Sequence, residues 1–137
     1  MARVELFSNE YITVEYRPDD KMIYHTVHKP MGVEQNEMLK QALNKGTDAL
    51  DRNRVTKWLS DDRKNGPLPA EMAEWGEQDW NPRTIRAGWK YWANVVPEEV
   101  EAAGALMPII ENLHKHGLKM RVFTNVEEAV AWLKSVD

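Results

Sequence analysis

The chain has 137 residues and no cysteine, a length that corresponds to about one domain of ordinary size. Hydrophobic residues make up 42% and charged residues 29%, which is typical of a soluble globular protein and excludes a disordered tail, a collagen or a coiled coil. The apolar runs are far shorter than the roughly 20 residues that span a bilayer, and the charges of Arg3 and Glu5 argue against a signal peptide. Without cysteine there are no disulfides, thiolate metal sites or cysteine nucleophiles, so a cytoplasmic location is expected.

Charge is spread evenly along the chain, with 18 basic and 22 acidic residues and a net charge of −4. Up to Leu68 there are 11 acidic and 11 basic residues, and beyond it 11 acidic and 7 basic. Because neither half is basic, we expect no nucleic acid and no anionic membrane as the main partner. The six tryptophans are the unusual feature of the composition, and the fold must house them.

The first half of the chain predicts strands followed by a helix. Apolar and polar residues alternate over residues 11–17, and Pro18, Asp19 and Asp20 then predict a turn into a second strand, so that the two strands form an antiparallel hairpin. Further on, apolar residues recur every three or four positions, which predicts an amphipathic helix. The predicted elements are strands at residues 4–7, 11–17, 22–28 and 55–60 and a helix at residues 33–50.

The second half alternates between helices and strands. A helix opens at Leu68 and Pro69 and is expected to break at Asn81 and Pro82. A strand apolar on both faces covers residues 89–96, and an acidic helix start at Pro97 leads to His116, with Pro108 expected to kink or restart that helix. Residues 118–123 predict the last strand, and Thr124 with Glu127 predicts a capping box for the final helix.

This order predicts a single α/β domain over residues 1–137. An antiparallel hairpin followed by strand–helix alternation implies a mixed sheet of five or six strands, in which the later strands are parallel. Right-handed crossovers place about four helices against the two faces of that sheet.

Three segments carry a resemblance to a known family. They are the opening hairpin, the strand over residues 89–97 with its acidic helix start, and the closing segment over residues 121–133, where Arg-x-Phe is followed by Glu-Glu-Ala-x-x-Trp-Leu. In element order the whole chain resembles the STAS-like domains, the fold of the bacterial anti-anti-sigma factors, and in particular a branch of small stand-alone bacterial proteins. The lipid-carrier domains of CRAL-TRIO type share parts of this topology. The resemblance implies a regulatory module that acts through contact with a protein.

One departure from the family pattern concerns its phosphorylation switch. Anti-anti-sigma factors carry the modified serine in an Asp-Ser-(Ser/Thr)-Gly loop after the third main strand. The corresponding stretch here, residues 59–66, places Ser60 near that position but lacks the motif. The adjacent carboxylates of Asp61 and Asp62 would repel an added phosphate, so we do not expect Ser60 to be such a switch.

Other chemistry finds little support in the sequence. Asp61 and Asp62 follow a strand end, where two carboxylates could act as acid and base or hold a divalent cation, but adjacent side chains diverge and a capped turn is the preferred interpretation. His25 and His28 point to opposite faces of their strand, so they predict no metal site. No glycine-rich phosphate loop and no nucleophile elbow is present, so neither a cofactor nor catalysis is expected.

The density of tryptophan outside the regular core stripes suggests that the helix over residues 68–80 and the loop after it form a surface for a ligand or a partner, although packing of the core is the simpler use of these rings. The leading hypothesis is a non-enzymatic module that binds a protein partner or a second copy of itself as a homodimer. The alternatives are a carrier or sensor of an apolar small molecule or lipid in a tryptophan-lined pocket, and an enzyme built on the two aspartates. The candidate surface residues are Trp58, Ser60, Asp61, Asp62, Trp75, Trp80 and Trp92.

Overall fold

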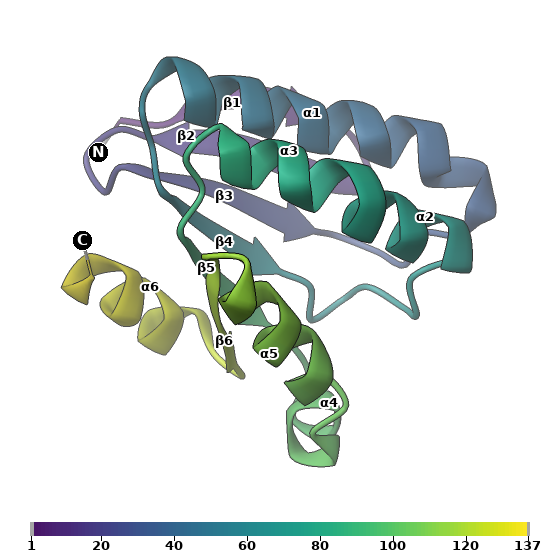
Figure 1. Ribbon diagram of the computed structural model, residues 1–137. Coiled ribbons are helices and arrows are strands. Elements are labelled where there is room, and N and C mark those ends of the chain that lie inside the picture. Colours follow the sequence, from purple (N-terminus) through teal and green to yellow (C-terminus); the bar gives the residue numbers. More distant parts are fainter. Residues whose placement is uncertain (1, 137) are drawn as a thin grey trace.

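The sheet is mixed and has six strands in the order β1-β2-β3-β4-β5-β6, so that each strand pairs with its neighbour in sequence (Figure 1). The structure is a computed structural model that describes residues 2–136. Strands β1, β2 and β3 pair antiparallel, whereas β3, β4, β5 and β6 run parallel, which confirms the predicted α/β fold. The strands are β1 (Val4–Ser8), β2 (Ile12–Arg17), β3 (Met22–Val27), β4 (Lys57–Asp61), β5 (Tyr91–Val95) and β6 (Lys119–Phe123).

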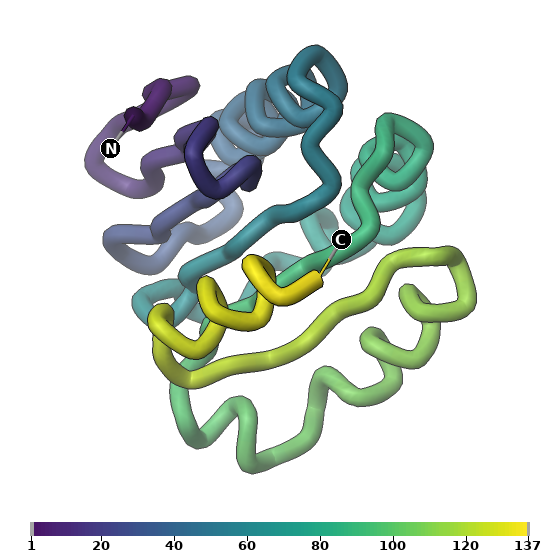
Figure 2. The backbone as a smooth tube through the Cα atoms, turned by 90° about the vertical axis from the view of Figure 1, so that its left-hand side faces the viewer, coloured from purple at the N-terminus to yellow at the C-terminus, as the bar shows by residue number. Residues whose placement is uncertain are grey.

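Helices cover the two faces of the sheet unequally. Helices α1, α2, α3 and α5 pack on one face, and α6 packs alone on the other, over the parallel strands (Figures 1 and 2). We call the first the tryptophan face and the second the α6 face. The helical elements are the 3₁₀ turn η1 (Val33–Gln35), α1 (Asn36–Arg52), α2 (Ala70–Trp75), the π-helical turn η2 (Gly76–Trp80), α3 (Asn81–Arg86), α4 (Glu98–Ala103), α5 (Met107–Lys115) and α6 (Val126–Ser135).

Each face of the sheet has its own hydrophobic core. On the tryptophan face, Trp58 and Trp89 are almost completely enclosed, beneath α1 and the helices after β4. On the α6 face, Leu59 packs against Phe123 and Leu133. Full burial of one such side chain contributes about 1.5–3 kcal/mol, so the two cores fix which face of each strand points inward.

One proline does not end its helix, and the other begins one. The predicted break at Asn81 and Pro82 is wrong, because the π-helical turn η2 leads directly into α3 and supplies the local distortion that a proline within a helix requires. The predicted long helix after β5 does divide. Gly104, with a φ of 66°, ends α4, and Pro108 lies in the first turn of α5, where the helix restarts as predicted.

The final helix is capped by a different residue from the one predicted. Asn125, not Thr124, is the N-cap, and its side-chain oxygen accepts a hydrogen bond of 2.9 Å from the backbone N–H of Glu128. Asparagine and threonine are both good caps, so the sequence pattern alone could not separate two adjacent positions. Within residues 2–136 no helix combines the length and apolar character needed to cross a membrane.

Candidate functional site

A row of buried polar side chains crosses the carboxyl ends of three parallel strands. His25 of β3, Ser60 of β4 and Asn94 of β5 are direct cross-strand neighbours on the tryptophan face. Their residues are only 6%, 1% and 7% exposed, respectively. The carboxyl ends of parallel strands are where open α/β sheets place their ligands, so this row is the first place to look for a function.

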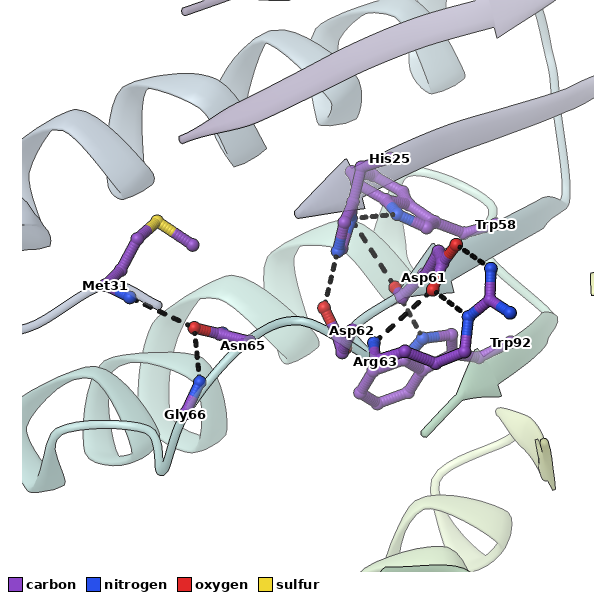
Figure 3. Close-up of polar contacts among 10 residues, drawn as sticks. His25, Met31, Trp58, Asp61, Asp62, Arg63, Asn65, Gly66 and Trp92 are labelled. Carbon is purple, nitrogen blue, oxygen red and sulfur yellow. Dashed lines mark hydrogen bonds and ion pairs between the residues drawn. The ribbon is translucent and has the colours of Figure 1, made fainter. Parts of the chain in front are cut away.

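The imidazole of His25 is held from both sides (Figure 3). Trp58 Nε1 donates a hydrogen bond of 3.0 Å to His25 Nδ1, and His25 Nε2 lies 3.1 Å from Asp62 Oδ1. An indole N–H can only donate, so Nδ1 must be the acceptor and the proton of the neutral ring is on Nε2, from which it is donated to Asp62. The ring is therefore fixed in one tautomer and one orientation.

Ser60, His25 and Asp62 form a chain of polar contacts, but they do not form a catalytic triad with an activated serine. Ser60 Oγ lies 3.5 Å from His25 Nδ1, the atom whose lone pair already accepts from Trp58. The same oxygen accepts a hydrogen bond of 2.9 Å from Trp92 Nε1. A nucleophilic serine needs a free base and access to substrate, and Ser60 has neither. Its enclosure also leaves a kinase no route to the hydroxyl in this conformation.

Asp61 and Asp62 point to opposite faces of the sheet, as predicted for adjacent strand residues. Asp62 turns to His25, whereas Asp61 accepts from Arg63 Nε and Nη2 at 2.9 and 2.8 Å. Burial alone would raise the pKa of Asp61, but hydrogen bonds from the Arg63 side chain and backbone outweigh it, and the pKa lies below its ordinary value. The two carboxylates therefore form neither an acid–base pair nor a joint cation site.

The loop between β4 and α2 is fixed to the rest of the molecule by three side chains. Besides Asp61 and Asp62, Asn65 Oδ1 accepts from the backbone N–H groups of Met31 at 3.2 Å and Gly66 at 3.0 Å, which ties this loop to the one after β3 (Figure 3). Exposed apolar side chains lie on these two tied loops and at the start of η1, which follows the loop after β3. We call them the loop surface, which consists of Pro30, Val33, Pro67 and Leu68.

The tryptophans of the tryptophan face pack against one another. Trp80 lies between Trp58, at 5.2 Å between ring centroids, and Trp89, at 5.1 Å, and Trp92 adjoins Trp89 at 5.1 Å. Trp75 stacks on Trp80 at 6.3 Å and, like Trp92, remains partly exposed. These rings fill the core. Two open surface grooves occur elsewhere on the described chain, and neither is lined by these five residues.

The structure brings most of the sequence candidates together, but many of them lie inside. Trp58, Ser60 and Trp80 are enclosed, Asp61 lies on the α6 face, and a partner can touch only Asp62, Trp75 and Trp92 directly. Sequence reasoning missed three side chains that hold them in place, which are His25, Arg63 and Asn65, and it also missed Asn94, which lies beside Ser60 in the strand register. The available signal was a polar residue inside an apolar strand, which both His25 and Asn94 are.

Comparisons with protein-family models, with curated proteins and with solved structures found no match to this chain. The described residues also contain no group of three or more histidine, aspartate, glutamate or cysteine side chains placed to hold a metal ion.

Proposed function

We propose that this protein is a non-enzymatic interaction module of STAS-like fold and that its partner, another protein, docks on the loop surface. The observation that carries the proposal is the exposure of Val33 and Leu68, which are 62% and 50% exposed on loops that polar side chains hold rigid. Large apolar side chains displayed on a fixed backbone are suited to recognition, because little conformational entropy is lost on binding.

The charges around the loop surface favour a different protein over a second copy. Glu34, Glu71 and Glu74 flank the apolar residues in sequence, are exposed, and form no ion pair within the described part of the chain. Lys64, just before Pro67, is exposed and likewise unpaired there, so unpaired acidic groups outnumber the basic one. A two-fold contact would bring these like charges together. A partner with an apolar anchor and a basic rim fits them better.

The competing functions have less support from the site. A carrier of an apolar molecule requires a cavity lined by tryptophan, whereas the rings of Trp58, Trp80 and Trp89 contact one another. An enzyme requires a reactive group with access to substrate, whereas Ser60 is enclosed and the His25 lone pair is occupied.

Site-specific photo-crosslinking in cells that naturally produce the protein tests the proposal. A photoreactive phenylalanine analogue replaces Leu68 in one variant and Val4 in another, since Val4 is a similarly exposed apolar residue (47%) on the edge strand β1. We expect one discrete crosslinked protein from position 68 and none from position 4, with mass spectrometry identifying the captured chain. Crosslinking of the protein to itself at position 68 would favour the homodimer and contradict the proposal, and so would identical patterns from both positions.

An Asn65→Ala variant gives a second test, because it frees the loop without altering an exposed apolar residue. It removes the side-chain oxygen that accepts hydrogen bonds from the backbone N–H groups of Met31 and Gly66. We therefore expect weaker crosslinking from position 68 in an otherwise folded protein. Undiminished crosslinking would show that rigidity of the loop is irrelevant to recognition.

A further inference from the structure

Basic residues gather at the amino-terminal ends of the parallel strands, on the side of the sheet opposite the loop surface. Strand register places Met22, Lys57, Tyr91 and Lys119 in one row across β3 to β6. Strands β4 and β6 begin with a lysine, and Lys21 and Lys90 immediately precede β3 and β5. Side chains alternate between the two faces of a sheet, so Lys57 and Lys119 lie on the α6 face with Met22 and Tyr91, whereas Lys21 and Lys90, one position earlier, belong to the opposite face.

Helices that run antiparallel to the strands bring further cations to the same edge. Arg52 ends α1, Arg54 follows it, and Arg86 ends α3. A basic residue at a helix carboxyl terminus has a structural role, since the helix dipole places about half a negative charge there. Neutralising the helix dipole explains about one basic residue at the end of each helix. The lysines at the starts of the strands do not lie at a helix terminus, so the dipole does not explain them. Acidic residues also lie at this end of the sheet, since Asp19 and Asp20 precede β3 and Asp51 lies in the last turn of α1, so only part of this end carries a local excess of cations.

Three of these cations surround one groove on the surface. An open hollow of about 580 Å³ lies between the end of α1 and the starts of β4 and β5, and its walls include Arg52, Arg54 and Lys90. All three side chains are exposed, and none forms an ion pair among residues 2–136. Asp51 and Thr56 also line it and supply oxygen acceptors. The hollow is open to solvent, so a ligand bound there remains partly hydrated.

Arg54 occupies the left-handed turn that ends α1. Its φ is 54°, and the turn is closed by a hydrogen bond of 2.9 Å from the Val55 N–H to the Leu50 carbonyl. Glycine is the usual residue in such a turn, and another residue there costs about 1–2 kcal/mol. The turn therefore places an arginine side chain at the mouth of the groove at a position where glycine would be more stable.

We propose that this groove binds a small phosphate-bearing anion, with Arg52, Arg54 and Lys90 contacting the phosphate and Asp51 accepting from a hydroxyl or amino group of the same molecule. Guanidinium groups match phosphate oxygens in a two-point geometry, and a lysine adds a compact charge. The proposal is independent of the loop surface, which lies at the other edge of the sheet. The sequence did not predict this site, because its basic residues are interspersed with acidic residues along the chain and form no basic run.

Titration with inorganic pyrophosphate, followed by the backbone amide signals of Thr56, Gly88 and Lys90 in NMR spectra at physiological salt, tests the site. We expect saturable shifts at these signals with a Kd of about 1 mM or tighter. The decisive variant is Arg54→Gly, which removes the guanidinium and relieves the positive φ, so the protein remains at least as stable as the parent. We expect it to bind about tenfold more weakly, since one charge-assisted hydrogen bond is lost.

The matched control is Lys21→Gly. Lys21 is also a basic residue at positive φ (51°) on the same edge, but it does not line the groove. Its substitution should leave pyrophosphate affinity nearly unchanged. The proposal is overturned if about 20 mM pyrophosphate gives no saturable shift, because the affinity would then be weaker than the Kd of about 1 mM expected for this site. It is also overturned if the two variants lose affinity equally, or if duplex DNA or vesicles containing phosphatidylserine bind while pyrophosphate does not, because a diffuse basic surface would then be responsible.

Discussion

Gly46 is the position at which α1 comes closest to the sheet. It lies in the buried face of the helix, directly over the ring of Trp58. A Cβ atom at this position would lie 3.0 Å from Trp58 Cζ2 and 3.1 Å from Cζ3, and closer still to Cη2. Carbon atoms prefer separations of about 3.5–4.0 Å, so Gly46→Ala requires the ring or the helix to move by roughly 1 Å.

The magnitude of the effect follows from opposing contributions. In a helix, alanine is favoured over glycine by about 0.5–1 kcal/mol. Overpacking a filled core costs about 1–3 kcal/mol, and Trp58 cannot turn aside without losing its hydrogen bond to His25, which is worth about 1 kcal/mol. We therefore expect Gly46→Ala to lower the free energy of unfolding by about 1–3 kcal/mol in total.

Gly76→Ala is the matched control. Gly76 is also helical, and a Cβ atom there would have no neighbour within 4 Å. We expect this variant to be unchanged or up to about 1 kcal/mol more stable than the parent. Urea unfolding of the three proteins, followed by tryptophan fluorescence, measures both differences. If Gly46→Ala were as stable as Gly76→Ala, the close packing of α1 on Trp58 would be refuted.

Three further predictions concern the carboxyl edge. Asp61→Asn lowers stability at pH 7, because the pKa of Asp61 is depressed in the folded state; its difference from the parent in urea unfolding should shrink as the pH falls below about 4, and a constant difference would refute the role of the charge. Asn94→Leu removes a buried Oδ1 that has no hydrogen-bond partner in the described chain, so the thermal midpoint should rise, corresponding to about 1 kcal/mol; a decrease would mean that this oxygen is satisfied in solution. Trp58→Phe removes the N–H that fixes the ring of His25, so ¹⁵N NMR should change from the Nε2–H tautomer alone to a mixture; a mixture already present in the parent would contradict the assignment.

The sequence by itself determined the type and order of the elements. Alternation over β2 and β3 with a turn at Pro18 gave the hairpin, and the three- and four-residue spacing of apolar side chains gave α1. These signals are local, since periodicity and turn chemistry depend on residues a few positions apart. The order of elements then restricted the sheet to an antiparallel start and a parallel remainder, because connections between parallel strands need a helix.

Tertiary structure alone decided which side chains meet. His25 and Asp62 are 37 positions apart in the chain, and parallel pairing of β3 with β4 brings them within hydrogen-bonding distance. The same pairing gathers the strand-starting lysines at one edge, although their charges are balanced locally along the chain. Such encounters depend on register and on the closure of long loops, about which a local pattern carries no information. For this reason the sequence placed the tryptophans in a core and indicated a surface beginning at Leu68, but it predicted neither the contribution of Pro30 and Val33 to that surface nor the basic groove.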